Sequence, residues 1–285
     1  MHRVIALLLM SGCDLVLGLN GRDGEEPADS RNEAPTDVRV VTCPPLGQAP
    51  AFLPVAHQVV VGCGELTASE APTRAMALCG GAIAQGSIDG PFSPVPEFLV
   101  VDPEHIDVPR LAPEGDLVLV RHWDPSNLYA QVRAYQRSGT AFTPAFDVTL
   151  ASRTFDTSVR FGTPSKGPAR RMFLRDPNIV LAEIELDAAG AGTVVASYEV
   201  SQLGLESIYQ VPNLSPDGLR AIFLAQYEGT GRVVYMDRAS LSERFRPVLP
   251  VEGIPAAATF DAFMTAECER VYYSSAGSLF WVEQH

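Results

Sequence analysis

Acidic residues are numerous in this chain, and some of them lie where they could support catalysis. Four aspartates lie near the ends of predicted strands, and they are Asp89, Asp124, Asp156 and Asp261. Two carboxyl groups held several ångströms apart can act as general acid and general base in glycoside hydrolysis. These four could act in this way only if the fold brought them to one site, which their spacing does not decide.

No other set of residues has the spacing of a known catalytic or cofactor site. The chain contains no GxSxG turn, no GxGxxG loop, no phosphate-binding P-loop and no CxxC pair. Apart from the two terminal ones, the histidines are His57, His105 and His122, and they are scattered. His122 stands beside Trp123 and could line a loop pocket, but a hydrogen-bonded residue at a strand end is the favoured interpretation. We therefore assign no catalytic residue, no metal site and no cofactor.

The cysteines have a pattern typical of an exported protein. The chain has five of them, and Cys13 follows an apolar N-terminal run after Ser11 and Gly12. The other four are an even number, which allows two disulfides in an oxidising compartment, with three possible connectivities. Cys63 and Cys79 lie on neighbouring strand-like segments and are the favoured pair, which leaves Cys43 to pair with Cys268. The alternative is that all four are reduced and buried.

The N-terminus has the order of a signal peptide. In MHRVIALLLMSGC a short basic start is followed by an apolar run and by small residues before Cys13. This segment resembles a bacterial lipobox, which implies a signal peptide of residues 1–12 and a diacylglycerol on the Cys13 thiol. The alternatives are an ordinary cleaved signal and a buried hydrophobic start. A membrane span is not predicted, because Asp14 ends the apolar stretch well short of the roughly 20 residues that a bilayer requires.

Beyond the cysteine, residues 13–37 are interpreted as a lipidated end followed by a disordered acidic tether. The stretch 20–38 is acidic, contains Pro and Gly, and has few large apolar side chains. Such a segment buries too little apolar surface to offset the entropy lost on ordering. Residues 38–285 are then expected to form the folded domain.

A degenerate turn motif recurs about every fifty residues in this domain, which is the signature of a propeller or another repeat array. Its copies lie at 111–120, 162–174, 214–224 and 264–273, with a weak fifth copy at 67–79.

The clearest copy is LSPDGLRAIFL, in which three residues have turn chemistry. Pro216 presets its own φ, Asp217 can accept a hydrogen bond from a nearby backbone amide, and Gly218 tolerates a positive φ. Pro113 and Gly115 hold the corresponding places in the copy at 111–120. Apolar and β-branched strand-like segments follow each turn.

Four strand-like segments per unit match one blade of an all-β β-propeller. At about fifty residues per blade the domain accommodates five blades, with six as the alternative. The last unit has only two strands after its turn, so its sheet would end in an open edge. We expect the N-terminal segments 38–43 and 57–63 to complete this blade and close the ring, and a bridge from Cys43 to Cys268 would hold the closure.

The motif at 214–224 resembles the Pro-Asp repeats of TolB-like propellers, which are similar to WD repeats. The matching residues are Pro212, Leu214, Ser215, Pro216, Asp217, Gly218, Ile222 and Phe223. In the copy at 264–273, Cys268 replaces the glycine. The resemblance implies an interaction module of the bacterial envelope. It carries over no binding residue, because the shared motif is a structural turn.

The net charge of the chain argues against one class of function. A formal charge of −13 without any basic run argues against nucleic-acid binding. We predict a non-enzymatic lipoprotein of the cell envelope, at the periplasmic face or in the outer membrane. Its partners would be the membrane, through the lipid, and an envelope protein or peptide bound by the propeller. The alternative is a carbohydrate-active enzyme, a glycosidase or lyase, that uses carboxylates at the channel mouth.

Aromatic residues recur at equivalent strand positions, at Phe173, Phe223 and Tyr273. A row of aromatics can bind carbohydrate. Burial between neighbouring blades is the favoured interpretation, because equivalent positions of a blade face the adjacent blade.

Overall fold

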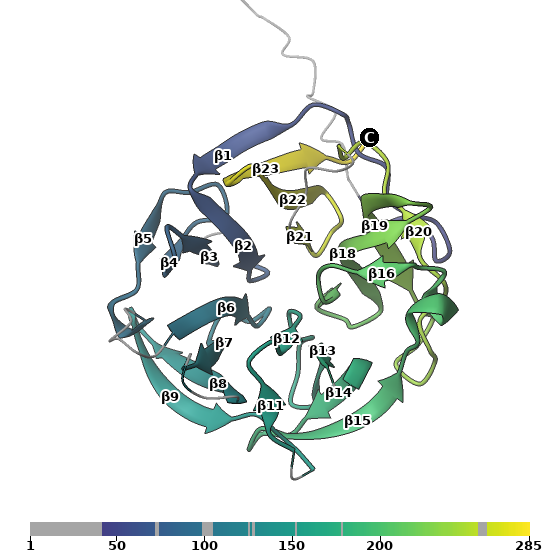
Figure 1. Ribbon diagram of the computed structural model, residues 1–285. Helices are drawn as coiled ribbons and strands as arrows, with labels where there is room; N and C mark the ends of the chain where they lie inside the picture. Colours follow the sequence, from purple (N-terminus) through teal and green to yellow (C-terminus); the bar gives the residue numbers. More distant parts are fainter. Residues whose placement is uncertain are drawn as a thin grey trace, which may run out of the picture. The chain divides into compact units, whose positions relative to one another are not determined.

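The chain divides into two units, Met1–Arg39 and Val40–His285. The computed structural model describes residues 42–71, 74–98, 105–124, 126, 129–151, 153–177, 179–255 and 261–285. Within these residues five β-sheets are arranged as a ring around a common centre (Figure 1). The domain is therefore a five-bladed β-propeller, and the predicted all-β class and blade number are confirmed. The predicted signal peptide, Cys13 and the acidic tether lie outside the described residues.

The strands of each blade follow one another from the centre of the ring outward. The first blade contains β2 (Cys63–Ala68), β3 (Ala75–Cys79), β4 (Ala82–Gly86) and β5 (Phe92–Pro94), and the 3-10 helix η1 (Pro96–Phe98) follows it. The second blade contains β6 (His105–Leu111), β7 (Leu117–Trp123), β8 (Tyr129–Ser138) and β9 (Ala141–Asp147), with β11 (Phe155–Asp156) paired to the start of β8.

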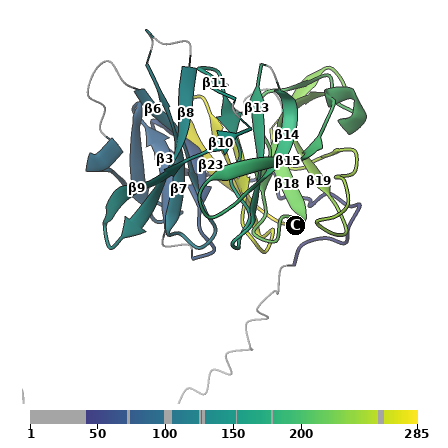
Figure 2. The same cartoon turned by 90° about the horizontal axis from the view of Figure 1, so that it is seen from below.

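The third blade contains β12 (Arg160–Phe161), β13 (Arg170–Asp176), β14 (Ile179–Leu186) and β15 (Ala191–Ser197), with β10 (Thr149–Leu150) parallel to β15. The 3-10 helix η2 (Val200–Leu203) leads to the fourth blade. There β16 (Ser207–Ile208) and β17 (Asn213–Leu214) both pair with β18 (Arg220–Tyr227), and β19 (Thr230–Asp237) and β20 (Leu249–Pro250) follow. Figure 2 shows the propeller from the side, with β13 and β14 running between its two faces.

The fifth blade is built from both parts of the chain. It contains β21 (Asp261–Met264), β22 (Arg270–Ser275) and β23 (Ser278–Glu283), and its outer strand is β1 (His57–Val61). In Figure 1 the purple β1 lies beside the yellow β23, and the two pair antiparallel. The predicted closure of the ring by an N-terminal strand is therefore confirmed for the segment at 57–61.

The segment before β1 is a strap that crosses the outside of the last two blades. The backbone amide of Phe52 donates to the Glu252 carbonyl at 3.2 Å, and that of Leu53 donates to the Glu283 carbonyl at 2.8 Å. The strand expected at 38–43 is not observed at Thr42 and Cys43, and its other residues lie outside the described part. The reason is that the free edge of β23 is taken by β1, while Cys43 is bonded elsewhere.

The recurring turn joins the innermost strand of every blade to the next strand, always at the same end. We call this end of the propeller the turn face. Gly115, Gly218 and Cys268 hold equivalent places in three of the turns, with φ of 76°, 69° and 61°. This left-handed conformation favours glycine, so Cys268 occupies it at some energetic cost. In the turn between β17 and β18, the Asp217 carboxylate accepts a hydrogen bond from the Leu219 backbone amide at 2.9 Å.

The hydrophobic core is divided among the contacts between blades. Among the described residues there are five apolar clusters, and each lies between two neighbouring blades. Phe173 and Phe223 are fully buried between the third and fourth blades, and Tyr273 is buried between the fourth and fifth. The prediction that these aromatics are core residues is confirmed. No helix in the described part of the chain is long and apolar enough to cross a membrane.

Candidate functional site

A network of buried hydrogen bonds crosses the centre of the channel. The innermost strands bring together the side chains of Thr67, Thr163 and Asn213, which are almost completely buried. The Thr163 hydroxyl donates to the Asn213 side-chain oxygen at 3.0 Å and lies 3.5 Å from the Thr67 hydroxyl. The Asn213 side-chain amide donates to the Ala262 carbonyl at 2.7 Å, and the Leu111 backbone amide donates to the Thr67 hydroxyl at 3.0 Å. Because these residues come from all five blades, the network joins the whole ring.

At the end away from the turn face, a buried carboxyl begins β21. Asp261 is 4% exposed and accepts a hydrogen bond from the Gln210 side-chain amide. Its second carboxyl oxygen has no hydrogen-bond partner. Burial raises the pKa of Asp261 to about 7, an effect that Arg110 opposes and Glu65 adds to. The structure therefore holds a proton on Asp261 up to neutral pH.

Glu65 and Arg110 face this carboxyl from the first and second blades. One Glu65 oxygen lies 3.8 Å from Arg110 Nη1, and burial raises the pKa of Glu65, while Arg110 lowers it. The buried Arg110 guanidinium also donates to the carbonyls of Phe161 at 3.2 Å and Pro109 at 2.9 Å. An acid that keeps its proton beside a second carboxyl is a possible general acid and base pair. Neither carboxyl lines the channel-mouth cavity at the turn face or any of three further cavities among the described residues.

The four aspartates considered from the sequence do not converge. Asp124 and Asp156 each accept a hydrogen bond from a backbone amide two residues further on, both at 2.8 Å, which lowers the pKa of each carboxyl. Asp89 lies at the turn face, whereas Asp261 lies at the opposite end of the fifth blade. The neighbour of Asp261 is Glu65, which the sequence analysis missed, because no local motif places it in the channel.

The three internal histidines take structural positions. His122 Nε2 is 2.8 Å from the Tyr135 hydroxyl, which agrees with a hydrogen-bonded residue at a strand end. His57 stacks on Trp281 with ring centroids 4.2 Å apart, and His105 stacks on Trp123 at 4.5 Å. Within the described ranges, no three His, Cys, Asp or Glu side chains are grouped so that they could hold a metal ion.

A cavity of about 290 Å³ opens at the turn face, and we call it the channel-mouth cavity. All five blades contribute to its lining. The buried part of its lining, which we call the floor, is mostly apolar and includes Ala68, Ile88, Leu214, Phe263 and Met264, together with the polar Ser69 and Thr163. Its rim carries charged groups, namely Glu70, Asp89, Glu267, Glu269 and Arg270. An apolar pocket with a few polar groups at its edge is the common form of a ligand site.

Several rim charges are already paired. The Lys166 ammonium donates to Glu70 at 2.7 Å. Arg270 lies 3.4 Å from the Asp89 carboxylate and also stacks over the Trp281 ring, 4.2 Å from its centroid. Asp89 also accepts a hydrogen bond from the Tyr272 hydroxyl at 3.0 Å. These contacts fix Arg270 across the seam between the first and fifth blades, where the ring closes.

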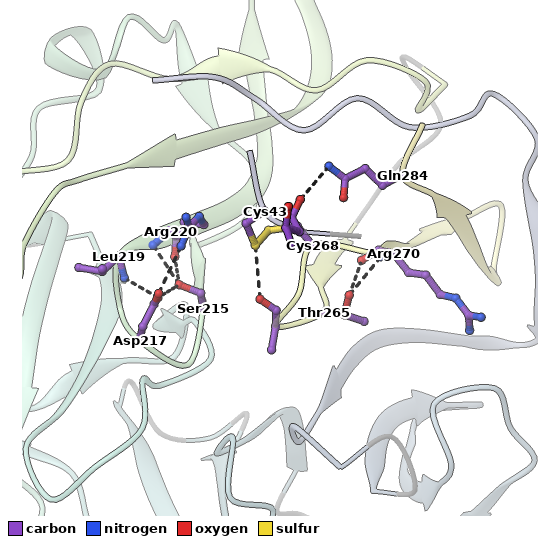
Figure 3. Close-up of a disulfide and its surroundings, with 11 residues drawn as sticks. Cys43, Ser215, Asp217, Leu219, Arg220, Thr265, Cys268, Arg270 and Gln284 are labelled. Carbon is purple, nitrogen blue, oxygen red and sulfur yellow. Dashed lines mark hydrogen bonds and ion pairs between the residues drawn. A yellow bond between two sulfur atoms is a disulfide. The ribbon is translucent and has the colours of Figure 1, made fainter. Parts of the chain in front are cut away.

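The turn of residues 265–269 forms one wall of the cavity, and a disulfide holds it. The structure contains bonds between Cys43 and Cys268 and between Cys63 and Cys79, the two pairings that the sequence favours. Figure 3 shows Cys268 within this turn, bonded to Cys43 of the N-terminal strap. In the same turn the Thr265 hydroxyl accepts a hydrogen bond from the Arg270 amide at 3.1 Å. The wall is thereby tied to the strap as well as to its own blade.

Comparison with known proteins shows similarity in fold alone. No known family model matches the chain, and a search of curated proteins finds no similar sequence. Among solved structures, the catalytic domain of a GH62 alpha-L-arabinofuranosidase of Coprinopsis cinerea is similar with a TM-score of 0.52 and 10% identity, over 83% of this chain and 97% of that one. A putative TolB of Agrobacterium tumefaciens has a TM-score of 0.46 and 12% identity, over 75% and 70% of the two chains. TolB of Acinetobacter baumannii has a TM-score of 0.43 and 11% identity, and the match covers 79% of this chain and 55% of the TolB chain. At such identities only the propeller fold is shared.

Proposed function

We propose that this protein is a non-enzymatic interaction module that binds a protein or peptide partner in the channel-mouth cavity. The observation that carries the proposal is the apolar floor of this cavity inside a charged rim at the turn face. An apolar floor provides affinity through burial of the partner's surface, and the rim provides specificity.

The turns around the cavity are held to one another, which suits them to binding. The Glu70 amide donates to the Pro113 carbonyl at 2.8 Å, and the Lys166 amide donates to the Pro216 carbonyl at 2.8 Å. The Gly167 amide donates to the Glu114 carboxylate at 3.0 Å. These bonds link neighbouring blades, so little ordering is needed when a partner binds.

We further propose that the module acts in the cell envelope, anchored by a lipid on Cys13. The support is the lipobox-like sequence, the acidic stretch after it, and two disulfides, which persist in exported proteins. The net negative charge of the chain agrees with this role, because it disfavours non-specific association of the propeller with acidic lipid headgroups and with nucleic acid.

Site-specific photo-crosslinking in the intact envelope tests the binding proposal. A photoreactive phenylalanine analogue is placed at Glu267, which is exposed at the cavity rim, or at Glu228, which is exposed in the hairpin at the opposite end of β18. We expect one reproducible adduct from position 267 and none from position 228. The same abundant envelope proteins captured from both positions would refute the proposal.

A hydrolase that uses Asp261 and Glu65 is the second candidate, and the raised pKa of Asp261 is the observation that favours it. Hydrolysis of a panel of aryl glycosides and polysaccharides tests it directly. Activity that is present in the wild type and absent after Asp261→Asn would establish the enzyme. We expect no turnover, because Asp261 is almost completely buried and neither carboxyl lines the channel-mouth cavity.

A further inference from the structure

We infer that the channel-mouth cavity accepts a lysine or arginine side chain, carried on an extended segment of the partner. This inference rests on the proposed function and names the chemistry of its partner. It is carried by the mostly apolar buried lining of the cavity, by a rim where four carboxylates (Glu70, Asp89, Glu267 and Glu269) face two cations (Lys166 and Arg270), and by the charge of the whole chain.

The floor fits the aliphatic part of such a side chain. Ile88, Phe263 and Met264 come from the first and fifth blades, and all three are buried side chains that line the cavity. Lysine and arginine bury a stem of methylene groups on apolar surface while their charged end stays at the edge. A cavity of about 290 Å³ has room for one such side chain with part of its backbone.

The rim carries excess negative charge. Lys166 pairs with Glu70, and Arg270 pairs with Asp89. Two acids of the 265–269 turn are left: Glu267 is exposed, and Glu269 comes only within 4.0 Å of Arg270. Arg270 is held by Asp89 and by the Trp281 ring, so it is not free to neutralise both glutamates.

An incoming cation would therefore meet carboxylates that lack a full counter-charge. A charge-assisted hydrogen bond to a carboxylate is roughly twice as strong as a neutral one. An acidic partner would meet repulsion at the rim, and a purely apolar one would remove water from the glutamates without replacing it. The net charge of −13 adds long-range attraction for a basic segment.

Titration of the full chain with three short peptides tests the inference. The peptides are acetyl-Ala-Ala-X-Ala-Ala-amide with X as lysine, norleucine or glutamate, so that the first two share an aliphatic stem and differ in the ammonium group. Trp281 stacks against Arg270, which lines the cavity, so its fluorescence is used to report occupancy. We expect the lysine peptide to bind at least tenfold more tightly than the norleucine peptide at low salt, with the advantage decreasing as salt is added.

Variants of the protein locate the effect. Glu267→Gln with Glu269→Gln should weaken binding of the lysine peptide about tenfold and leave the norleucine peptide unchanged. Glu228→Gln removes one exposed carboxylate at the other face and should change neither affinity. Equal unfolding midpoints for all variants show that the fold is intact.

Other outcomes separate this inference from the proposed function. Equal binding of the lysine and norleucine peptides, or no binding of either, overturns the inference. The proposed function then still stands if position 267 gives a specific crosslink, and fails if it does not. A lysine preference that persists in the double glutamine variant also overturns the inference, because the cation would be recognised elsewhere.

Discussion

Replacing Asp261 by asparagine should remove a pH-dependent loss of stability. The side chain is buried at the start of β21, and one of its carboxyl oxygens has no hydrogen-bond partner. Burial raises the pKa of this carboxyl from its ordinary value of 3.8 to about 7, against the opposing charge of Arg110. Asparagine has nearly the same shape and brings no charge into the channel.

The sign and size of the effect follow from the two pKa values. The unfolded chain loses this proton near pH 3.8, whereas the folded chain keeps it to about pH 7. The contribution of Asp261 to the free energy of unfolding is therefore fully present below pH 3.8 and is lost as the pH rises to about 7. At about 1.4 kcal/mol for each tenfold difference in proton affinity, the loss reaches about 4 kcal/mol at pH 7.

Urea unfolding of the wild type and the Asp261→Asn variant, at several pH values from 4 to 8, measures this loss. All other titrating groups are common to both proteins, so the difference in the free energy of unfolding isolates Asp261. Between pH 4 and pH 7 the free energy of unfolding of the variant should rise relative to that of the wild type by about 4 kcal/mol, and above pH 7 the difference should level off. Glu65→Gln should lower the pKa of Asp261 and reduce the loss, because the Glu65 charge adds to the shift. A difference that does not change with pH would refute the reasoning.

Two further predictions concern the bridges and the core. The Cys43–Cys268 bridge spans 225 positions and the Cys63–Cys79 bridge spans 16, so replacing the first pair by serine should lower the free energy of unfolding by about 5 kcal/mol and the second by about 3 kcal/mol. Equal losses in denaturant unfolding would contradict this dependence on loop length. Phe223→Ala should cost about 3–5 kcal/mol, since the ring is fully buried between the third and fourth blades. A variant with an unchanged unfolding midpoint would show that the ring is not part of the core.

The parts of the fold that the sequence predicts are those that local chemistry determines. Pro216, Asp217 and Gly218 define a turn by their own backbone preferences, so copies of the turn reveal the repeat without any knowledge of long-range contacts. Counting the strands after the last turn then predicts that the ring borrows a strand from the N-terminal part, which β1 supplies. The pairing of Cys63 with Cys79 follows from their neighbouring strand-like segments, and Cys43 and Cys268 are then the two cysteines that remain.

The polar groups inside the propeller could not be predicted in this way. Glu183 and Arg238 form an ion pair at 2.7 Å, each 1% exposed, from the third and fourth blades. Asp261 and Glu65 meet from the fifth and first blades. Which side chain of an inner strand points into the channel depends on how the blades are rotated against one another. That rotation is set by packing between blades, and no local pattern of residues records it.

The bridge between Cys43 and Cys268 also determines how the chain would respond to a mechanical load. A pull between Thr42 and His285 passes from Cys43 through the two sulfur atoms to Cys268, and then along the last residues. Residues 44–267 lie in a covalently closed loop, so the covalent path of the tension bypasses them. Only β22 and β23 can be drawn out, over roughly 60 Å at full extension. With the bridge intact, four blades remain folded under a force that would otherwise unravel the whole ring.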